Sequence, residues 1–272
     1  MRKSHNLIYL KKDFKLDEQI FNLGILLLPS AVVFSIILLL ISLLFSFTKN
    51  YKLFFQEKSN FILVICAFLM IISCVKNTFF IDHNTHQILF GQNENYKDLI
   101  WLDLFNWVPL FFCFWGFQPY LKTFTQRYNS SINLLIGTIP VVVSCIGQYF
   151  FKWYGPISGF NGLIVWYQKP LIEGNGISGL FSNQNYTGFW LSVAWAFSLG
   201  LIYLQSTNLC KRIFSILASS SLFYFIILTN SRNALISSII PVPLIFGFKI
   251  FFLGILIILI LVFFIFCLFQ LT

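Results

Sequence analysis

Long apolar runs separated by short polar segments make up most of the chain. The clearest runs are residues 61–81, 99–119, 132–151, 186–206, 213–229, 233–248 and 250–270. A helix of about 20 apolar residues crosses the hydrocarbon core of a bilayer, and a helix satisfies its own backbone hydrogen bonds there. Membrane β-barrels instead show short segments of alternating polarity. The pattern therefore predicts an all-α fold, a polytopic transmembrane helical bundle.

The first apolar stretch, residues 20–47, is too long for one simple span. As a single helix it would measure about 42 Å, against a hydrocarbon core of about 30 Å. Pro29 and Ser30 interrupt it near one third of its length. It is either one tilted, kinked span or a helical hairpin.

The positive-inside rule favours the hairpin. With a cytoplasmic N-terminus, the hairpin leaves five of the 18 Lys and Arg residues outside or at span ends: Lys76, Lys97, Lys152, Lys169 and Arg232. A single span would move the five N-terminal cations outside as well. The sequence thus predicts about eight or nine membrane segments. Residues 1–19 form a cytoplasmic segment, and residues 20–272 form one transmembrane helical domain with an outer loop at 152–185.

Composition excludes several classes of protein. The chain is 58% hydrophobic and only 10% charged, with a mean hydropathy of +0.81, which does not fit a soluble domain. The net charge of +9 is spread between apolar runs, so it indicates topology and not nucleic-acid binding. The six cysteines form no CxxC pair, and His83 and His86 lack further ligands nearby, so we expect no metal and no cofactor.

Arg232 is the first candidate for function, because it is a permanent charge in the apolar stretch IILTNSRNALISSII. Asn230 and Ser231 precede it, and either could cap the next helix and leave amide groups for an anion. A guanidinium suits a bidentate grip on phosphate. The alternative is an arginine that anchors a helix end among lipid headgroups.

The second candidate is the segment GNGISGLFSNQNYTGFW, residues 174–190, where the outer loop enters a span. Asn183 and Asn185 can cap that helix or bind sugar hydroxyls. Lys169, in the same loop, is a candidate second contact to phosphate. Aromatic residues upstream suit either an interfacial belt or stacking on sugars; they are Trp153, Tyr154, Trp166 and Tyr167. Asp103 is a weaker candidate, as a partner for Arg232 or as a base.

These two stretches together resemble the paired signatures of the O-antigen ligase and O-antigen polymerase-like membrane glycosyltransferases. The family pattern G-x-F-x-N-x-N-x-x-G matches Gly179, Phe181, Asn183, Asn185 and Gly188. One span later, the pattern T-x-S-R matches Thr229, Ser231 and Arg232. The segment LGILLLPSA at 23–31 is similar to the family's first helical turn. The order of these features covers most of the chain.

The resemblance implies transfer or polymerisation of a polyprenyl-diphosphate-linked glycan at the outer face of a bacterial inner membrane. An acceptor hydroxyl attacks the anomeric carbon, the lipid diphosphate leaves, and Arg232 stabilises its charge. In the ligases a histidine on a large later loop activates the acceptor. This chain ends where that loop would begin. We therefore expect a truncated product, a partner chain that supplies the loop, or a protein that keeps lipid binding and has lost transfer.

Two other functions fit the same sequence. One is a transporter or flippase for lipid-linked glycans, which would carry polar residues at mid-depth on several spans. The other is a non-catalytic membrane partner. The polar residues gather at the outer edge, which favours chemistry at the outer face. Besides the lipid-linked glycan, membrane lipids are the expected partners.

Overall fold

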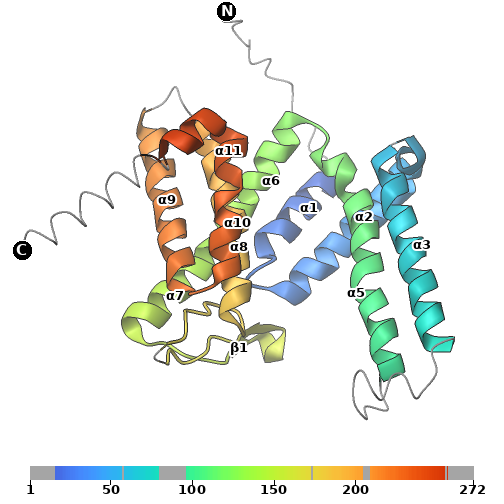
Figure 1. The fold of residues 1–272 in the computed structure, drawn as a ribbon, viewed down its shortest axis with the longest axis horizontal. Helices are drawn as coiled ribbons and strands as arrows, with labels where there is room; N and C mark the ends of the chain where they lie inside the picture. The colour runs from blue at the N-terminus through green and yellow to red at the C-terminus, as the bar shows by residue number, and fades with distance from the viewer. Residues whose placement is uncertain are drawn as a thin grey trace, which may run out of the picture. The chain divides into compact units, whose positions relative to one another are not determined.

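The computed structural model describes residues 16–56, 58–79, 96–172, 174–204, 209–254 and 256. Helices dominate these residues (Figure 1). The longer helices are α1 (Leu16–Leu27), α2 (Val32–Gln56), α3 (Lys58–Phe79), α5 (Tyr96–Phe117), α6 (Phe124–Gly137), α7 (Ile139–Phe151), α8 (Gln184–Leu204) and α9 (Leu209–Leu228). The shorter ones are η1 (Gln118–Leu121), η2 (Phe160–Gly162), α10 (Arg232–Ile239) and α11 (Pro241–Phe246).

The chain divides into two compact units. Unit 1 comprises residues 1–21 and 37–128, and unit 2 comprises residues 22–36 and 129–272. Five helical segments of the described residues are long and apolar enough to cross a membrane: Val32–Lys49, Asn60–Thr78, Phe124–Phe151, Gln184–Leu204 and Leu209–Leu228. The chain is therefore an all-α membrane protein, and eight or nine segments are not confirmed. The expected span 250–270 lies mostly outside the described residues.

The predicted break in the first apolar stretch is present. Helix α1 ends at Leu27, residues 28–30 form a turn, and α2 begins at Val32. The Ser35 hydroxyl donates a 2.7 Å hydrogen bond to the Gly24 carbonyl and so ties the start of α2 to α1. With 12 residues, α1 rises about 18 Å, which is shorter than a bilayer core.

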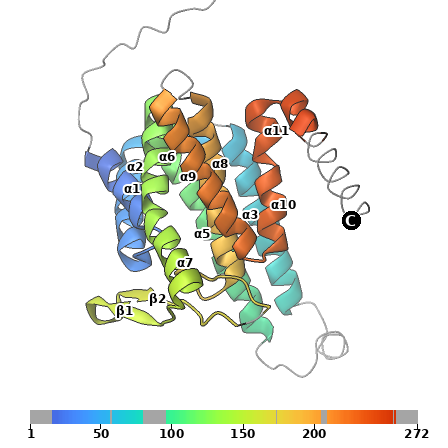
Figure 2. The same cartoon turned by 90° about the vertical axis from the view of Figure 1, so that its left-hand side faces the viewer.

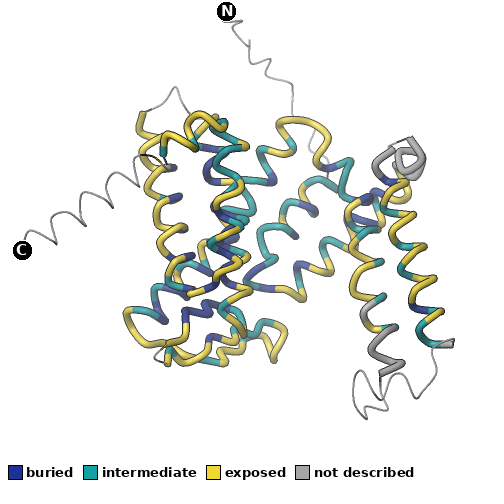
Figure 3. Tube along the Cα trace, viewed as in Figure 1, coloured by how far each residue is buried: buried dark blue, intermediate teal, exposed yellow. Residues whose placement is uncertain are grey.

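Unit 2 has a compact helical core. Val141 of α7, Leu191 of α8 and Ile226 of α9 are fully buried, and Ala234 of α10 joins the same cluster. Buried positions gather where these helices face one another (Figure 3). Small residues line the α8 contact with α10, which lets the two backbones approach closely.

The outer loop and the last expected span before residue 250 contain more detail than the sequence predicted. In the loop, β1 (Ile157–Gly159) and β2 (Ile164–Trp166) form an antiparallel hairpin (Figure 2). The expected span at 233–248 is two short helices, α10 and α11, with a turn at Ile240. Pro241 causes the break, because proline lacks the N–H that would continue the helical ladder.

Unit 1 contains α3 and α5 side by side (Figure 1). The Asn60 and Gln118 side chains exchange amide hydrogen bonds of 3.3 and 2.8 Å near the end of this pair. Asn60 is 1% exposed, so this exchange satisfies a buried amide. The expected span 99–119 corresponds to α5, which is not among the five apolar segments.

Candidate functional site

The two sequence stretches that carry the resemblance pack directly on each other. The Ile177 amide donates a 3.0 Å hydrogen bond to the Leu228 carbonyl. The Gly176 backbone lies so close to Thr229 that an added Cβ would coincide with its carbonyl group. At Gly188 an added Cβ would lie 2.7 Å from the Ala234 Cβ. Glycine at these positions therefore permits the contact that joins the two stretches.

The turn before α10 is built from small polar residues, as expected. The Thr229 hydroxyl donates to the Ile226 carbonyl at 2.7 Å and accepts from the Ser231 amide at 3.3 Å. Asn230 adopts a left-handed backbone with φ of 52°. Ser231 is the N-cap of α10, and its hydroxyl accepts from the Ala234 amide at 3.4 Å. Arg232 is the first helical residue, and its side chain is exposed.

The junction before α8 is also fixed by polar side chains that hydrogen-bond to backbone groups. The Asn183 side chain accepts a 2.9 Å hydrogen bond from the Asn185 amide, so Asn183 caps the helix. Asn185 itself is exposed in the first turn. The Gln184 side chain accepts a 2.6 Å hydrogen bond from the Gly176 amide, and the buried Thr187 hydroxyl donates to the Ser178 carbonyl. These contacts fix the loop against the start of α8.

Gln148 organises the loop and was not expected from the sequence. Its side-chain oxygen accepts from the Ser178 and Gly179 amides at 2.9 and 3.0 Å. Its side-chain nitrogen donates to the Lys169 carbonyl at 2.6 Å and to the Ser178 hydroxyl at 3.1 Å. The residue is 1% exposed. The one sequence signal that could have identified Gln148 is its polar side chain within an apolar run, residues 132–151.

A cavity of about 280 Å³ opens among these segments. Its polar lining comes from Tyr149, Lys152, Asn175 and Asn230, and its apolar walls come from Leu171, Ile172, Ile177 and Leu228. The Lys152 ammonium lies 5.7 Å from the centre of the Tyr149 ring. Lys152 has a left-handed backbone with φ of 56°, where the chain leaves α7. The cavity presents amides, a ring and a cation, which suit a sugar or an anion.

We call the end of unit 2 formed by residues 152–185 and 228–232 the loop end. Lys152, Lys169 and Arg232 lie there, and all three side chains are exposed. Arg232 does not line the cavity, although Asn230, two residues before it, does. The Lys169 backbone is fixed by Gln148 and by the Ser178 hydroxyl. The structure thus brings Asn230 and Ser231 together with the glycine-rich stretch 174–190, and it does not bring Lys169 into the cavity.

The charge of unit 2 is strongly one-sided. Its sequence contains six cations and one carboxylate, Glu173. The cations are Lys152, Lys169, Lys211, Arg212, Arg232 and Lys249. Unit 2 contains no histidine. Such a balance favours anionic ligands.

The remaining candidates have different outcomes. Trp166 is not free to stack on a sugar, because its indole N–H donates a 2.9 Å hydrogen bond to the Ser30 carbonyl. Trp153 stacks on Phe151 at 5.8 Å, and Tyr154 and Tyr167 are exposed. His83, His86 and the Asp103 side chain lie outside the part of the structure that is described. Among the described residues no three His, Cys, Asp or Glu side chains could hold a metal.

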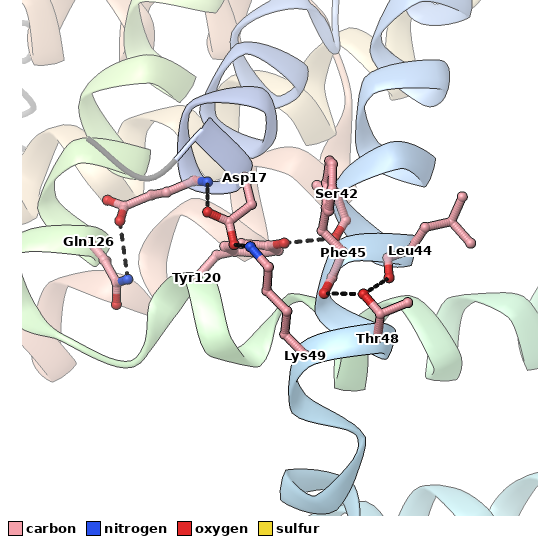
Figure 4. Close-up of polar contacts among 9 residues, drawn as sticks. Asp17, Ser42, Leu44, Phe45, Thr48, Lys49, Tyr120 and Gln126 are labelled. Carbon is pink, nitrogen blue, oxygen red and sulfur yellow. Dashed lines mark hydrogen bonds and ion pairs between the residues drawn. The ribbon is translucent and has the colours of Figure 1, made fainter. Parts of the chain in front are cut away.

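A second polar cluster lies in unit 1 (Figure 4). Lys49 and Asp17 form a 3.0 Å ion pair, Gln126 donates to Glu18 at 3.3 Å, and the Tyr120 hydroxyl donates to the Ser42 carbonyl at 2.7 Å. Burial raises the pKa of Tyr120 to about 12, so it remains a neutral donor. These groups satisfy one another, which indicates a structural role.

The fold and the loop end define an all-α membrane protein with a basic, sugar-sized cavity at one end of its larger unit. Comparison of the chain with protein-family models, with curated proteins and with solved structures finds no match. The function is therefore argued from the geometry of the loop end.

Proposed function

We propose that the protein binds a polyprenyl-diphosphate-linked glycan at its loop end and takes part in transferring or polymerising that glycan. In this proposal the loop end faces the outer side of a bacterial inner membrane, and the N-terminus is cytoplasmic. The observation that carries the proposal is the packing of the 174–190 stretch on the 228–234 turn. That packing fixes the start of α10, where Ser231 caps the helix and the Arg232 side chain is exposed. Asn230, two residues before Arg232, lines the cavity.

The ligand's chemistry matches the residues at this end. A lipid diphosphate carries its charge at the membrane surface, where an arginine at a helix start can bind it in bidentate fashion. The sugar next to the diphosphate has hydroxyl groups for the amides of Asn175 and Asn230. Its apolar ring face suits Tyr149.

The reaction would break the bond between the anomeric carbon and the diphosphate oxygen. It would form a bond from that carbon to the acceptor oxygen. Arg232 would stabilise the negative charge that develops on the departing diphosphate. The acceptor's proton requires a base, and the described residues of unit 2 include neither a histidine nor a carboxylate for that role.

A second candidate is a non-catalytic subunit that binds the lipid-linked glycan for another chain. The two candidates share the same binding site. Purified protein supplied with lipid-linked glycan and acceptor separates them. Glycan transfer by the chain alone supports the enzyme, and transfer only after a partner is added supports the subunit.

Arg232→Ala is the direct test of the shared site. Loss of a charge-assisted contact of about 1.5–3 kcal/mol should weaken binding of undecaprenyl diphosphate by about 10- to 100-fold. Binding is measured on protein in lipid nanodiscs, and surface glycan profiles are compared in cells whose own copy has been deleted. Lys249→Ala is the matched control, because Lys249 is also an exposed cation but lies outside the loop end and its cavity. Equal binding by the two variants would refute the proposal.

A further inference from the structure

A second cavity lies away from the loop end, along the membrane-spanning part of unit 2. It is a groove of about 590 Å³ between α6–α7 and α9, with α8 at its base. The two outer walls run in the same direction, since α7 and α9 both end at the loop end. Ile132 and Cys210 line the end of the groove that is distant from the loop end, and Val143 and Leu222 line the end nearer to it.

The length of the groove matches one leaflet of a bilayer. Along α9 the lining residues extend from Cys210 to Leu222, a rise of about 18 Å. Along α6 and α7 they extend from Ile132 to Val143, a rise of about 16 Å. Half of a hydrocarbon core of about 30 Å is about 15 Å. The groove therefore runs from one membrane surface to near the midplane.

The walls of the groove are suited to hydrocarbon and not to a polar ligand. The lining is mostly leucine, isoleucine, valine and phenylalanine. Three of its hydroxyl groups donate to carbonyls of their own helices: Thr138 to Leu134 at 2.9 Å, Ser198 to Trp195 at 2.7 Å and Ser221 to Ala218 at 2.7 Å. These donors are therefore already used.

The surface end of the groove is positively charged. Lys211 lines it, and Arg212 follows in the first turn of α9. The positive end of the helix dipole adds to these charges. The sequence of unit 2 as a whole contains six cations and one carboxylate, so its net charge is positive. A ligand that fits both features has an apolar chain and an anionic head.

We propose that this groove binds an anionic glycerophospholipid from the leaflet opposite the loop end. One acyl chain lies between α6–α7 and α9, and the phosphate lies at Lys211 and Arg212. Apolar contacts alone do not select one lipid in a bilayer, because lipid tails are as apolar as the groove. Selection therefore comes from the headgroup charge, and residence comes from the fit of the chain. This site is independent of the proposed glycan function.

Native mass spectrometry of the full chain in mild detergent tests the proposal. The probes are phosphatidylglycerol and phosphatidylcholine with identical acyl chains. The wild-type protein should retain phosphatidylglycerol more strongly, and removing Lys211 and Arg212 by Lys211→Ala and Arg212→Ala should reduce that preference by about fivefold per charge. Lys249→Ala, which removes an exposed cation outside the groove, should leave the preference unchanged.

A filling substitution tests the acyl-chain part. Ser221→Phe places a ring in the groove, whereas Ser220→Phe places the same ring at the neighbouring exposed position outside it. Retention of phosphatidylglycerol should fall several-fold in the first variant only. Equal retention in both variants, or equal retention of the two lipids by the wild type, would overturn the proposal and identify the groove as ordinary lipid-facing surface.

Discussion

At the residue scale, Gln148 shows how one buried amide can hold a long loop. Both of its side-chain atoms make two hydrogen bonds, and all four partners belong to residues 169–179. A buried group of this kind is costly to disturb, because each partner left unsatisfied loses its hydrogen bond without gaining water. The loop end therefore depends on a side chain that does not itself line the cavity.

Gln148→Glu tests this role with almost no change in shape. The new carboxylate oxygen would face the Lys169 carbonyl, where the amide now donates. We expect the free energy of unfolding to fall by about 3 kcal/mol or more, measured as a lower Tm in detergent micelles. Asn185→Asp makes the same chemical change at an exposed position in the first turn of α8. A negative charge near the N-terminus of a helix interacts favourably with the helix dipole, so this control should leave the Tm unchanged or raise it slightly.

The ion pair between Asp17 and Lys49 predicts a dependence on pH. Burial acts to raise the pKa of the Asp17 carboxyl, but the hydrogen bond and the charge of Lys49 outweigh it and lower the pKa below its usual value of 3.8. The pair therefore contributes stability above about pH 4, and that contribution is lost as the pH falls through the lowered pKa.

Asp17→Asn should accordingly reduce stability by about 0.5–1 kcal/mol near neutral pH, because Lys49 is largely exposed. The difference in Tm from the wild type should shrink as the pH falls through the lowered pKa of Asp17 and disappear below it. In a Lys49→Met background, Asp17→Asn should have little effect at any pH. A constant difference across the pH range would show that the ion pair is not its cause.

At the element scale, local signals in the sequence were sufficient for several features. The break at Pro29 and Ser30 and the caps at Asn183 and Ser231 follow from preferences that act within a few residues. Pro241 could also have predicted a helix boundary. Because residues 233–248 are mostly apolar, one span was expected where two short helices exist. Helix ends were thus predictable where polar residues or prolines marked them.

Features set by distant contacts were not predictable. The importance of Gln148 depends on a loop 20–30 residues later in the chain folding back onto α7. The cavity depends on the left-handed turn at Lys152, which directs the lysine over the Tyr149 ring. Hydrophobic periodicity contains no information on either contact.

The packing of α8 on α10 predicts opposite effects for two glycines of one helix. Gly188→Ala would place a Cβ 3.0 Å from the Ser231 Cβ and closer still to Ala234, so it should reduce stability by about 1–3 kcal/mol. Gly200→Ala meets no atom within 4 Å and should be neutral or stabilising by up to about 1 kcal/mol. The Tm values of the two purified variants measure this contrast. A similar Tm for both would contradict the close contact between α8 and α10.

At the scale of the whole molecule, the charges are distributed unevenly along the chain. Eight of the nine acidic residues precede residue 104, and Glu173 is the exception. The sequence of unit 2 therefore contains six cations and one carboxylate, and five of these cations lie at the loop end or at the start of α9. Both proposed ligands are anionic lipids for this reason, and they would approach unit 2 from opposite membrane surfaces.

The orientation of unit 2 is the prediction on which that picture depends. Helix α8 has 21 residues and is apolar enough to cross the bilayer, so the loop before it and the start of α9 should lie on opposite sides. We expect a cysteine introduced as Tyr154→Cys, in a background without native cysteines, to react with a membrane-impermeant maleimide on intact cells. A cysteine introduced as Arg212→Cys should react only after permeabilisation.

Each alternative labelling pattern has a distinct consequence. Labelling of both positions on intact cells would mean that α8 does not cross the membrane, which would remove the basis for a leaflet-length groove beside it. The reversed pattern would keep the crossing but place the loop end in the cytoplasm. The lipid diphosphate would then have to be bound before its glycan reached the outer surface. That result would favour a transporter over an outer-face transferase, because the same basic cavity would load its ligand from the inside.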